Sequence, residues 1–311
     1  MTTTQQNTAK KTIYEKKGHI AYLTINYPEK ANIMSNQVIQ EMGEAYKDFW
    51  MDRDMRVMIL TSVGERHFSG GHHIQPPPQG QTVADVRHQR GDQVVWPPPG
   101  SVNGRKPSID PDSGHDFPKI YKPVIAAVNG IAAGAGLYTL LTTTDIRVAC
   151  AEHGRFYYAL LSNRGGIGSG PLPTRIMKQL NYVHAMKFLL MDEPIDAQEA
   201  VRIGLINEAV PHGQLMTRCE QIAERIASLP PVSVRFLKEF LIRSQDLSVD
   251  QAWHLQFMYH HLANMHSGDS DDSTNAFLEK RGRTVRGEMR DCDKHAHSKL
   301  VEGYLPYDPF G

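Results

Sequence analysis

The spacing of apolar and polar residues predicts a chain that begins with strands and ends with helices. Residues 11–26 form two runs around Lys17-Gly18, a pattern typical of two strands joined by a turn. An amphipathic helix is expected over residues 36–51, with Ser35 as its N-terminal cap. Residues 56–62, "RVMILTS", form a short apolar run that indicates a buried strand.

The middle of the chain alternates strands with helices. "PVIAAV" at 123–128 predicts a buried strand, "NG" a turn, "GAGLYTLL" the start of a helix and "DIRVA" a further strand. From residue 171 the pattern is mainly helical, interrupted by a short strand expected within 205–210. This order favours an α/β fold whose β-rich core comes first and whose helical region comes last.

Residues 75–118 differ from the segments around them. They contain "QPPPQG", "WPPPG" and "GRKPSIDPDSG", and they lack a regular apolar repeat. Such a stretch predicts a long loop, with one helix near 82–93, that is either an exposed insertion or a lid over a site.

Composition excludes several functional classes. Lys and Arg number 34 and Asp and Glu also number 34, so no net charge attracts nucleic acid or a membrane surface. The cysteines Cys150, Cys219 and Cys292 form no C-x-x-C pair, which favours a reduced protein. Neither a signal peptide nor an apolar run of about 18 residues is visible, so we expect a cytoplasmic protein without membrane spans.

Two glycine-rich turns are the strongest candidates for chemistry. "FSGGHH" at 68–73 and "NGIAAGAG" at 129–136 each follow an apolar strand. The second turn opens a helix at Gly134-Ala135, where backbone N–H groups lack helical partners and the helix dipole is positive. If the turn at Gly71-His72 contributes another N–H group, the pair forms an oxyanion hole. The alternative is that these glycines serve packing alone.

Several segments together resemble the crotonase (enoyl-CoA hydratase/isomerase) superfamily. They are "NYPEKANIMSNQVIQEM", "HFSGGHHI", "KPVIAAVNGIAAGAGLYTLL", "IDAQEAVRIGLINEAVP", "LPPVSVRFLKEFL" and "AFLEKR". The resemblance covers roughly residues 10–285, and the combination is far more specific than any single segment.

This resemblance implies a fold, an assembly and a substrate class. The fold would be a β/β/α spiral core over 10–210, then a helical trimerisation region over 211–290 and a tail over 291–311. The assembly would be a homotrimer or a dimer of trimers. The substrate would be an acyl-CoA whose thioester oxygen lies between the N–H groups of His72 and Ala135. Coenzyme A would contact Ala31, Gly70, Ile74, Gly134 and, from a neighbouring subunit, Phe277 and Lys280. No separate cofactor is expected, because coenzyme A is part of the substrate.

The chain departs from the hydratase pattern at the acid/base positions. Hydratases of the superfamily use two glutamates, and here the first position holds Tyr138 while the second falls near Leu160. Between Phe117 and Met191 the acidic residues are Asp145 and Glu152, and neither falls at a glutamate position. Two-glutamate hydration is therefore not expected.

Other side chains could transfer the proton. Tyr138 suits a hydrogen-bond donor or acid, unless it is a core residue. His73, whose ordinary pKa of about 6.5 suits proton transfer, stands where the family carries an aspartate. Asp145 is either structural or a base. At most one of Tyr157 and Tyr158 can face a pocket, because neighbouring strand residues point to opposite faces.

A metal site is not expected at the histidines of the first turn. His67, His72 and His73 have no cysteine or aspartate cluster beside them, and zinc requires three or four convergent ligands. The sequence thus predicts an enzyme that stabilises an acyl-CoA enolate. The reaction could be an atypical hydration, an isomerisation, a decarboxylation or a carbon–carbon cleavage. The long loop and the aromatic residues Trp96, Tyr138, Tyr157 and Tyr158 suggest a bulky or cyclic acyl group as its substrate. A non-catalytic protein that binds coenzyme A or RNA is the alternative.

Overall fold

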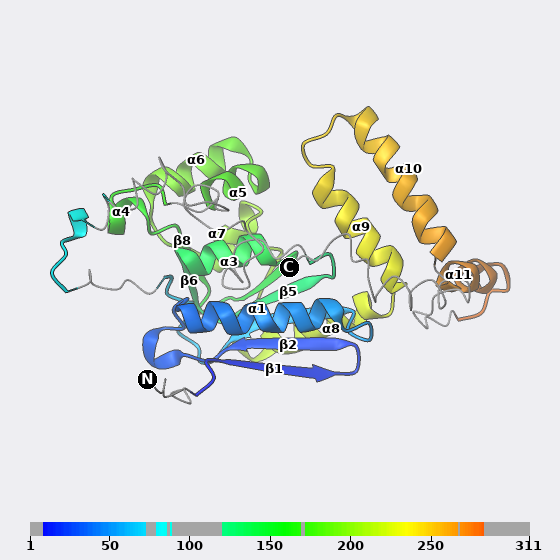
Figure 1. Cartoon of the computed structure of the whole chain (residues 1–311), viewed down its shortest axis with the longest axis horizontal. Helices are drawn as coiled ribbons and strands as arrows, with labels where there is room; N and C mark the ends of the chain where they lie inside the picture. Colours follow the sequence, from blue (N-terminus) through cyan, green and yellow to red (C-terminus); the bar gives the residue numbers. More distant parts are fainter. Residues whose placement is uncertain are drawn as a thin grey trace, which may run out of the picture.

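The structure is a computed structural model that describes residues 9–72, 79–85, 88, 120–168, 172–266 and 268–282 (Figure 1). The expected loop 75–118 lies mostly outside these residues, and so do His73, Ile74 and the tail 291–311. Statements about the fold below refer to the described part of the chain.

A six-stranded sheet forms the larger layer, in the order β1-β2-β3-β5-β7-β10. β1 and β2 form an antiparallel hairpin around Gly18, and the remaining neighbours run parallel. β3 and β5 are almost entirely apolar and buried, as strands covered on both faces must be. The bounds are β1 (Thr12–Lys17), β2 (Ile20–Ile25), β3 (Val57–Ser62), β5 (Val124–Val128), β7 (Ile146–Cys150) and β10 (Glu208–Val210).

A smaller sheet lies beyond the carboxyl ends of these strands, in the order β4-β6-β8-β9. Each of its first three strands directly follows a strand of the large sheet: β4 (His67–Ser69) follows β3, β6 (Ile131–Ala133) follows β5, and β8 (Arg155–Tyr157) follows β7. β9 (Ile195–Asp196) closes the sheet in the antiparallel direction. This repeated strand–strand–helix unit confirms the expected spiral.

Helices cover both faces of the large sheet. α1 (Asn36–Met51) begins at Ser35, whose hydroxyl accepts the N–H of Val38, and confirms the predicted bounds and cap. Its apolar stripe, which includes Tyr46 and Phe49, is fully buried in the main core. On the other face, α8 (Leu215–Ala227) packs against β3, β5 and β7 through a second cluster.

Several short helices connect or flank the strands of the two sheets. They are η1 (Pro28–Lys30), α3 (Ala135–Thr143), α4 (Leu161–Arg164), α5 (Leu172–Gln179), α6 (Tyr182–Met191), α7 (Ala197–Arg202) and η3 (His212–Gln214). α3 packs on β4, β6 and α5, so it links the two layers at the point where both glycine turns lie.

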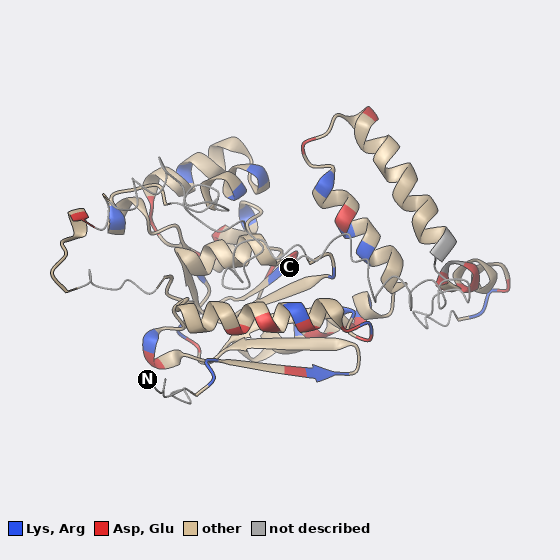
Figure 2. Ribbon diagram, in the orientation of Figure 1, with Lys and Arg blue, Asp and Glu red and all other residues tan. Residues whose placement is uncertain are grey.

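Three C-terminal helices extend away from the sheets (Figure 1). α9 (Pro231–Arg243) and α10 (Val249–His266) pack on each other, and α11 (Gly268–Leu278) follows at the far end. Their surface is unusually apolar, and Figure 2 shows almost no charged residue along α10. Trp253, Phe257 and Met258 are each more than 60% exposed. No described helix combines the length and the apolar character needed to cross a membrane.

Candidate functional site

The two glycine turns meet at one edge of the small sheet. β4, β6 and β8 are neighbours, so the residues that follow them converge there. The N–H of Gly134 donates to the carbonyl oxygen of Tyr157 over 3.0 Å, which ties the start of α3 to β8. The sequence alone predicted the two turns, and the sheet order brings them side by side.

Gly71 lies close to the second turn. Its φ of +107° is one that other residues rarely adopt, and a Cβ there would lie 3.2 Å from the carbonyl oxygen of Ala133 and 3.6 Å from the nitrogen of Ala135. A side chain at this position would therefore fill the space between the first turn and the backbone nitrogen at the start of α3.

Gly136 fixes the depth at which α3 meets β4. A Cβ on this residue would lie 2.5 Å from the carbonyl oxygen of Ser69, a distance that real Cβ atoms do not tolerate. Only glycine allows the first turn of α3 to rest on the strand that leads into Gly70-Gly71. Ala135 is the first residue of α3, so its N–H has no acceptor within the helix.

The segment 27–34 holds the first turn from the other side. The N–H of Gly70 donates to the carbonyl oxygen of Ala31 over 2.8 Å, and the N–H of Met34 donates to that of Gly71 over 2.8 Å. Asn32, which is buried, donates to the carbonyl oxygens of Val63 and His67 and accepts the N–H of Tyr27. The predicted residues Ala31, Gly70, His72, Gly134 and Ala135 therefore lie in one region.

Tyr138 lies one turn further along α3 and is almost fully buried. Burial lowers the pKa of Arg175 on the adjacent helix α5, and the nearby Tyr138 partly reverses this by raising that pKa. The two side chains therefore interact electrostatically.

A hydrogen-bonded relay starts at the end of β8. The hydroxyl groups of Tyr157 and Ser162 are 2.7 Å apart, and Ser162 donates to the carboxylate of Asp192 over 2.8 Å. Because the one hydroxyl proton of Ser162 points to Asp192, the proton of Tyr157 points to Ser162. Asp192 is 5% exposed and also accepts the N–H groups of Ala159 and Ser162 at 2.6 Å each.

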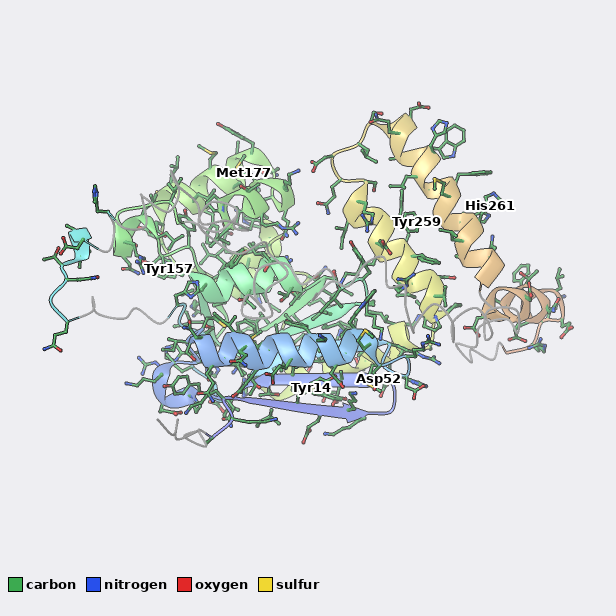
Figure 3. All side chains as sticks on the ribbon, in the orientation of Figure 1. Tyr14, Asp52, Tyr157, Met177, Tyr259 and His261 are labelled. Atoms are coloured by element: carbon green, nitrogen blue, oxygen red, sulfur yellow. The ribbon has the colours of Figure 1, made fainter. Side chains whose placement is uncertain are left out.

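Tyr157 and Tyr158 point in different directions. Tyr157, which is labelled in Figure 3, pairs in register with Ala133 next to the second glycine turn, and its hydrogen bond with Ser162 is exposed. Tyr158 is buried, donates to the carbonyl oxygen of Ile167 over 2.8 Å, and has a pKa raised mainly by that burial. Of the two tyrosines, Tyr157 is the one beside the convergent turns.

Comparisons with known proteins agree with this geometry. The model of the enoyl-CoA hydratase/isomerase family matches residues 15–96 and 115–287. The (E)-benzylidenesuccinyl-CoA hydratase of Thauera aromatica is 30% identical over 278 residues, which cover 88% of this chain and 98% of that protein. The chain belongs to the enoyl-CoA hydratase/isomerase family.

Further relatives place this family member among acyl-CoA enzymes. The carnitinyl-CoA dehydratase of Citrobacter koseri is 30% identical over 280 residues, covering 88% of this chain and 97% of that protein. A crystal structure of an enoyl-CoA hydratase/isomerase from Mycobacterium paratuberculosis is 28% identical, with a TM-score of 0.72 over 89% of this chain and 99% of the other. The predicted crotonase fold and acyl-CoA family are thereby confirmed.

Asp145 lies apart from the turns of this hydratase/isomerase fold. It precedes β7, beyond the opposite end of α3 from Ala135, and the nine residues of α3 span about 13 Å. Its carboxylate accepts the N–H of Val124 over 2.8 Å and the ammonium group of Lys238 over 2.7 Å. This placement favours the structural alternative for Asp145, which joins β5 to α9.

Phe277 and Lys280 also lie away from the family's glycine turns within one chain. Phe277 is on α11, 83% exposed, and Figure 1 shows this helix at the end of the molecule furthest from β6 and β8. Their predicted contact with coenzyme A concerns a neighbouring subunit and stays a prediction.

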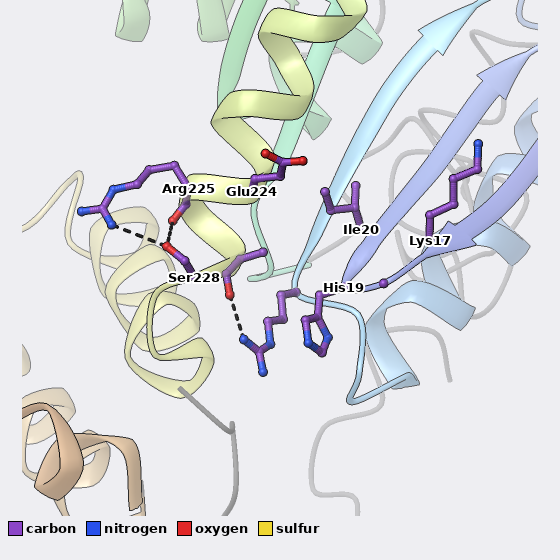
Figure 4. Close-up of a pocket in the computed structure, with 9 residues that line it drawn as sticks. Lys17, His19, Ile20, Glu224, Arg225 and Ser228 are labelled. Carbon is purple, nitrogen blue, oxygen red and sulfur yellow. Dashed lines mark hydrogen bonds between the residues drawn. The ribbon is translucent and has the colours of Figure 1, made fainter. Parts of the chain in front are cut away.

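A surface pocket of about 690 Å³ lies elsewhere, between the β1–β2 turn and α8 (Figure 4). It is lined by Lys17, His19, Ile20, Glu224, Arg225 and Ser228 among others. The turn lies at the amino end of β2, whereas Ala31 follows its carboxyl end, about 20 Å away for six residues. No residue of the glycine turns lines this pocket, so it is not the family's acyl-CoA site.

Three residues of the candidate site were absent from the sequence prediction: Ser162, Asp192 and Arg175. Ser162 and Asp192 are 30 residues apart, and no local pattern links them. Arg175 lies on α5, which follows a Gly-rich segment of the sequence over residues 165–171.

Proposed function

We propose that the chain adds water to, or removes it from, the Cα–Cβ bond of an acyl-CoA through an enolate of the thioester. The observation that carries this proposal is that Gly71 lies so close to Ala133 and Ala135 that a Cβ on it would be 3.2 Å from the carbonyl oxygen of the first and 3.6 Å from the nitrogen of the second. The printed names of the relatives, a hydratase and a dehydratase among them, support the reaction class.

In this mechanism the thioester oxygen accepts the N–H groups of His72 and Ala135. Charge develops on that oxygen when a nucleophile adds at Cβ, so both donors interact more strongly with the enolate than with the substrate. The dipole of α3 adds to this effect, because its positive end is at Ala135. The loss of one such donor typically lowers kcat by about 10²–10³.

The relay through Tyr157 replaces the glutamates as the route for the proton. As water attacks Cβ, Tyr157 takes a proton from the water and passes its own to Ser162, which passes its proton to Asp192. The reverse transfer delivers the proton to Cα of the enolate, so the enzyme ends in its starting state. Tyr138 on α3 acts as a hydrogen-bond donor to the acyl group.

The substrate of this proposal carries a bulky acyl group. Leu160 stands near the second glutamate position, where it places an apolar side chain instead of a carboxylate. The benzylidenesuccinyl-CoA named for one relative is such an acyl group. We also propose a cytoplasmic homotrimer or dimer of trimers, because α9–α11 expose large apolar side chains in one chain.

A panel of enoyl-CoA and hydroxyacyl-CoA esters tests the reaction. Straight-chain, branched and aryl esters would be compared by the change in thioester absorbance and by mass of the product. Turnover is expected with aryl or branched esters. Turnover with short straight chains alone contradicts the bulky substrate, and stabilisation by acyl-CoA without any turnover favours a binding protein.

Ala135→Pro tests the oxyanion hole. Proline is tolerated at the first position of a helix but has no N–H, so the fold should persist while kcat falls by about 10²–10³. Ala135→Ser is the matched control, because it retains the N–H. Equal kcat values for the two variants would refute the role of this donor.

Tyr157→Phe and Ser162→Ala test the relay. Each is expected to lower kcat by about 10²–10⁴ and to leave the binding of coenzyme A unchanged. Tyr158→Phe is the control, since that hydroxyl group bonds to Ile167. Tyr157→Phe with an unchanged kcat would remove Tyr157 from the mechanism.

A further inference from the structure

Three potential metal ligands meet at the edge of the large sheet: Cys150, His153 and His212. One ligand atom from each lies within 4.8 Å of those from the other two. They come from segments that follow adjacent parallel strands, because Val210 of β10 pairs with Cys150 of β7. The N–H of Ala151 donates to the carbonyl oxygen of Val210 over 2.8 Å and holds the two segments together.

The spacing of the first two ligands fits a tetrahedral ion. The Sγ atom of Cys150 lies 3.6 Å from the Nδ1 atom of His153. Zinc–sulfur and zinc–nitrogen bonds of about 2.3 and 2.05 Å, held at a tetrahedral angle, separate the two atoms by about 3.6 Å. The observed distance between these two atoms therefore already matches the distance that a bound zinc ion requires.

His212 is already oriented for coordination. Its Nε2 atom lies 3.5 Å from a carboxylate oxygen of Glu65, whereas its Nδ1 atom is buried and has no hydrogen-bond partner among the described residues. Histidines that bind metals usually direct their second nitrogen at a carboxylate, which fixes the tautomer. An unpartnered buried nitrogen is otherwise costly, and a metal ion would remove that cost.

Glu152 contacts two of the three residues. Its Oε2 atom accepts the thiol of Cys150 at 3.1 Å and the backbone N–H of His212 at 3.0 Å. A cation that binds the sulfur of Cys150 displaces the thiol proton. The carboxylate can then turn from the thiol to the cation.

We propose that Cys150, His153 and His212 bind one divalent transition-metal ion of the zinc class, with Glu152 as the fourth ligand. Four protein ligands make a closed, structural site. Such an ion joins the turn after β7 to the segment that leads from β10 into α8, at the β10 edge of the large sheet. No residue of the glycine turns takes part, so the site is independent of the proposed function.

Metal titration of the full-length chain tests this site. The protein is stripped with a chelator under reducing conditions and titrated with Zn²⁺ by calorimetry and with Co²⁺ by absorption. We expect one ion per chain, a thiolate-to-cobalt charge-transfer band, the visible bands of tetrahedral cobalt, and release of a proton on binding. Zinc should also raise the Tm.

Variants separate this site from adventitious binding by other histidines. Cys150→Ser is expected to abolish the charge-transfer band, and His153→Asn and His212→Asn to weaken zinc at least 10²-fold. Glu65→Gln should weaken it about 10–100-fold through the orientation of His212. Cys219→Ser and His254→Asn are controls, the first a buried cysteine and the second an exposed histidine, and both should bind zinc as the natural chain does.

Two results would overturn the proposal. One is the absence of a tetrahedral cobalt spectrum in the natural chain, which would leave a hydrogen-bonded cluster without a metal. The other is unchanged zinc affinity in His153→Asn, a substitution at a turn that should not disturb folding. Circular dichroism of each stripped variant checks that the chain is folded before the titration.

Discussion

The contact between α3 and β4 makes a quantitative prediction for Gly136→Ala. The new methyl group would lie 2.5 Å from the carbonyl oxygen of Ser69 and 2.7 Å from its Cβ, whereas ordinary contact begins at 3.4 Å. The helix must therefore move by about 0.9 Å, the difference between the ordinary and the available distance. Ser69 cannot yield instead, because it is fully buried in a paired strand.

Two opposing terms set the magnitude. Overpacking of this kind costs about 1–3 kcal/mol, and the better helix propensity of alanine returns at most about 1 kcal/mol. We expect a net loss of about 1–2 kcal/mol in the free energy of unfolding. The movement also displaces the N–H of Ala135 from the first turn, and a shift near 1 Å can lower kcat about 10²-fold.

Urea unfolding and steady-state kinetics would be measured on the same preparations. Gly282→Ala is the matched control, because a Cβ there meets nothing within 4 Å and the residue has no positive φ. If Gly136→Ala unfolds within about 0.3 kcal/mol of the natural chain and retains its kcat, α3 is not held against β4 as described.

Three further predictions concern residues outside the glycine turns. Burial lowers the pKa of Lys122 to about 8, from an ordinary value of 10.5. Between these two pH values the unfolded chain binds more protons than the folded chain, so the free energy of unfolding should rise with pH by up to about 3 kcal/mol. Urea midpoints across this range should show the rise in the natural chain but not in Lys122→Met. Asn32→Ala removes the amide that donates to the carbonyl oxygens of Val63 and His67, of which the second retains the hydroxyl group of Ser62, and should lower the free energy of unfolding by about 1–3 kcal/mol in the same assay. Burial raises the pKa of Cys219 to about 12, so its alkylation by iodoacetamide, followed by mass spectrometry, should require unfolding; rapid native labelling would contradict its burial.

Local patterns were sufficient for most of the fold. Ser35 and the apolar stripe after it place α1 within its observed bounds, because capping and helical periodicity are properties of neighbouring residues. The same holds for β5 and for the start of α3 at Ala135, where an apolar run meets small residues. The approach of Gly71 to Ala133 could be expected only from the family resemblance, since it depends on strand order in the small sheet.

The acid of the proposed relay shows where such patterns stop. The segment from Phe117 to Met191, which spans both glutamate positions of the family, ends one residue before Asp192. It ends α6 in a left-handed conformation, with a φ of 45°, and this turns its carboxylate toward Ala159 and Ser162. An aspartate in this conformation at a helix end is ordinarily interpreted as a residue that terminates the helix. The sequence around Asp192 therefore gives no indication that its carboxylate is linked to Tyr157, 35 residues earlier. The position that holds a glutamate in the family's hydratases can therefore lose its acid while the fold supplies one from another helix.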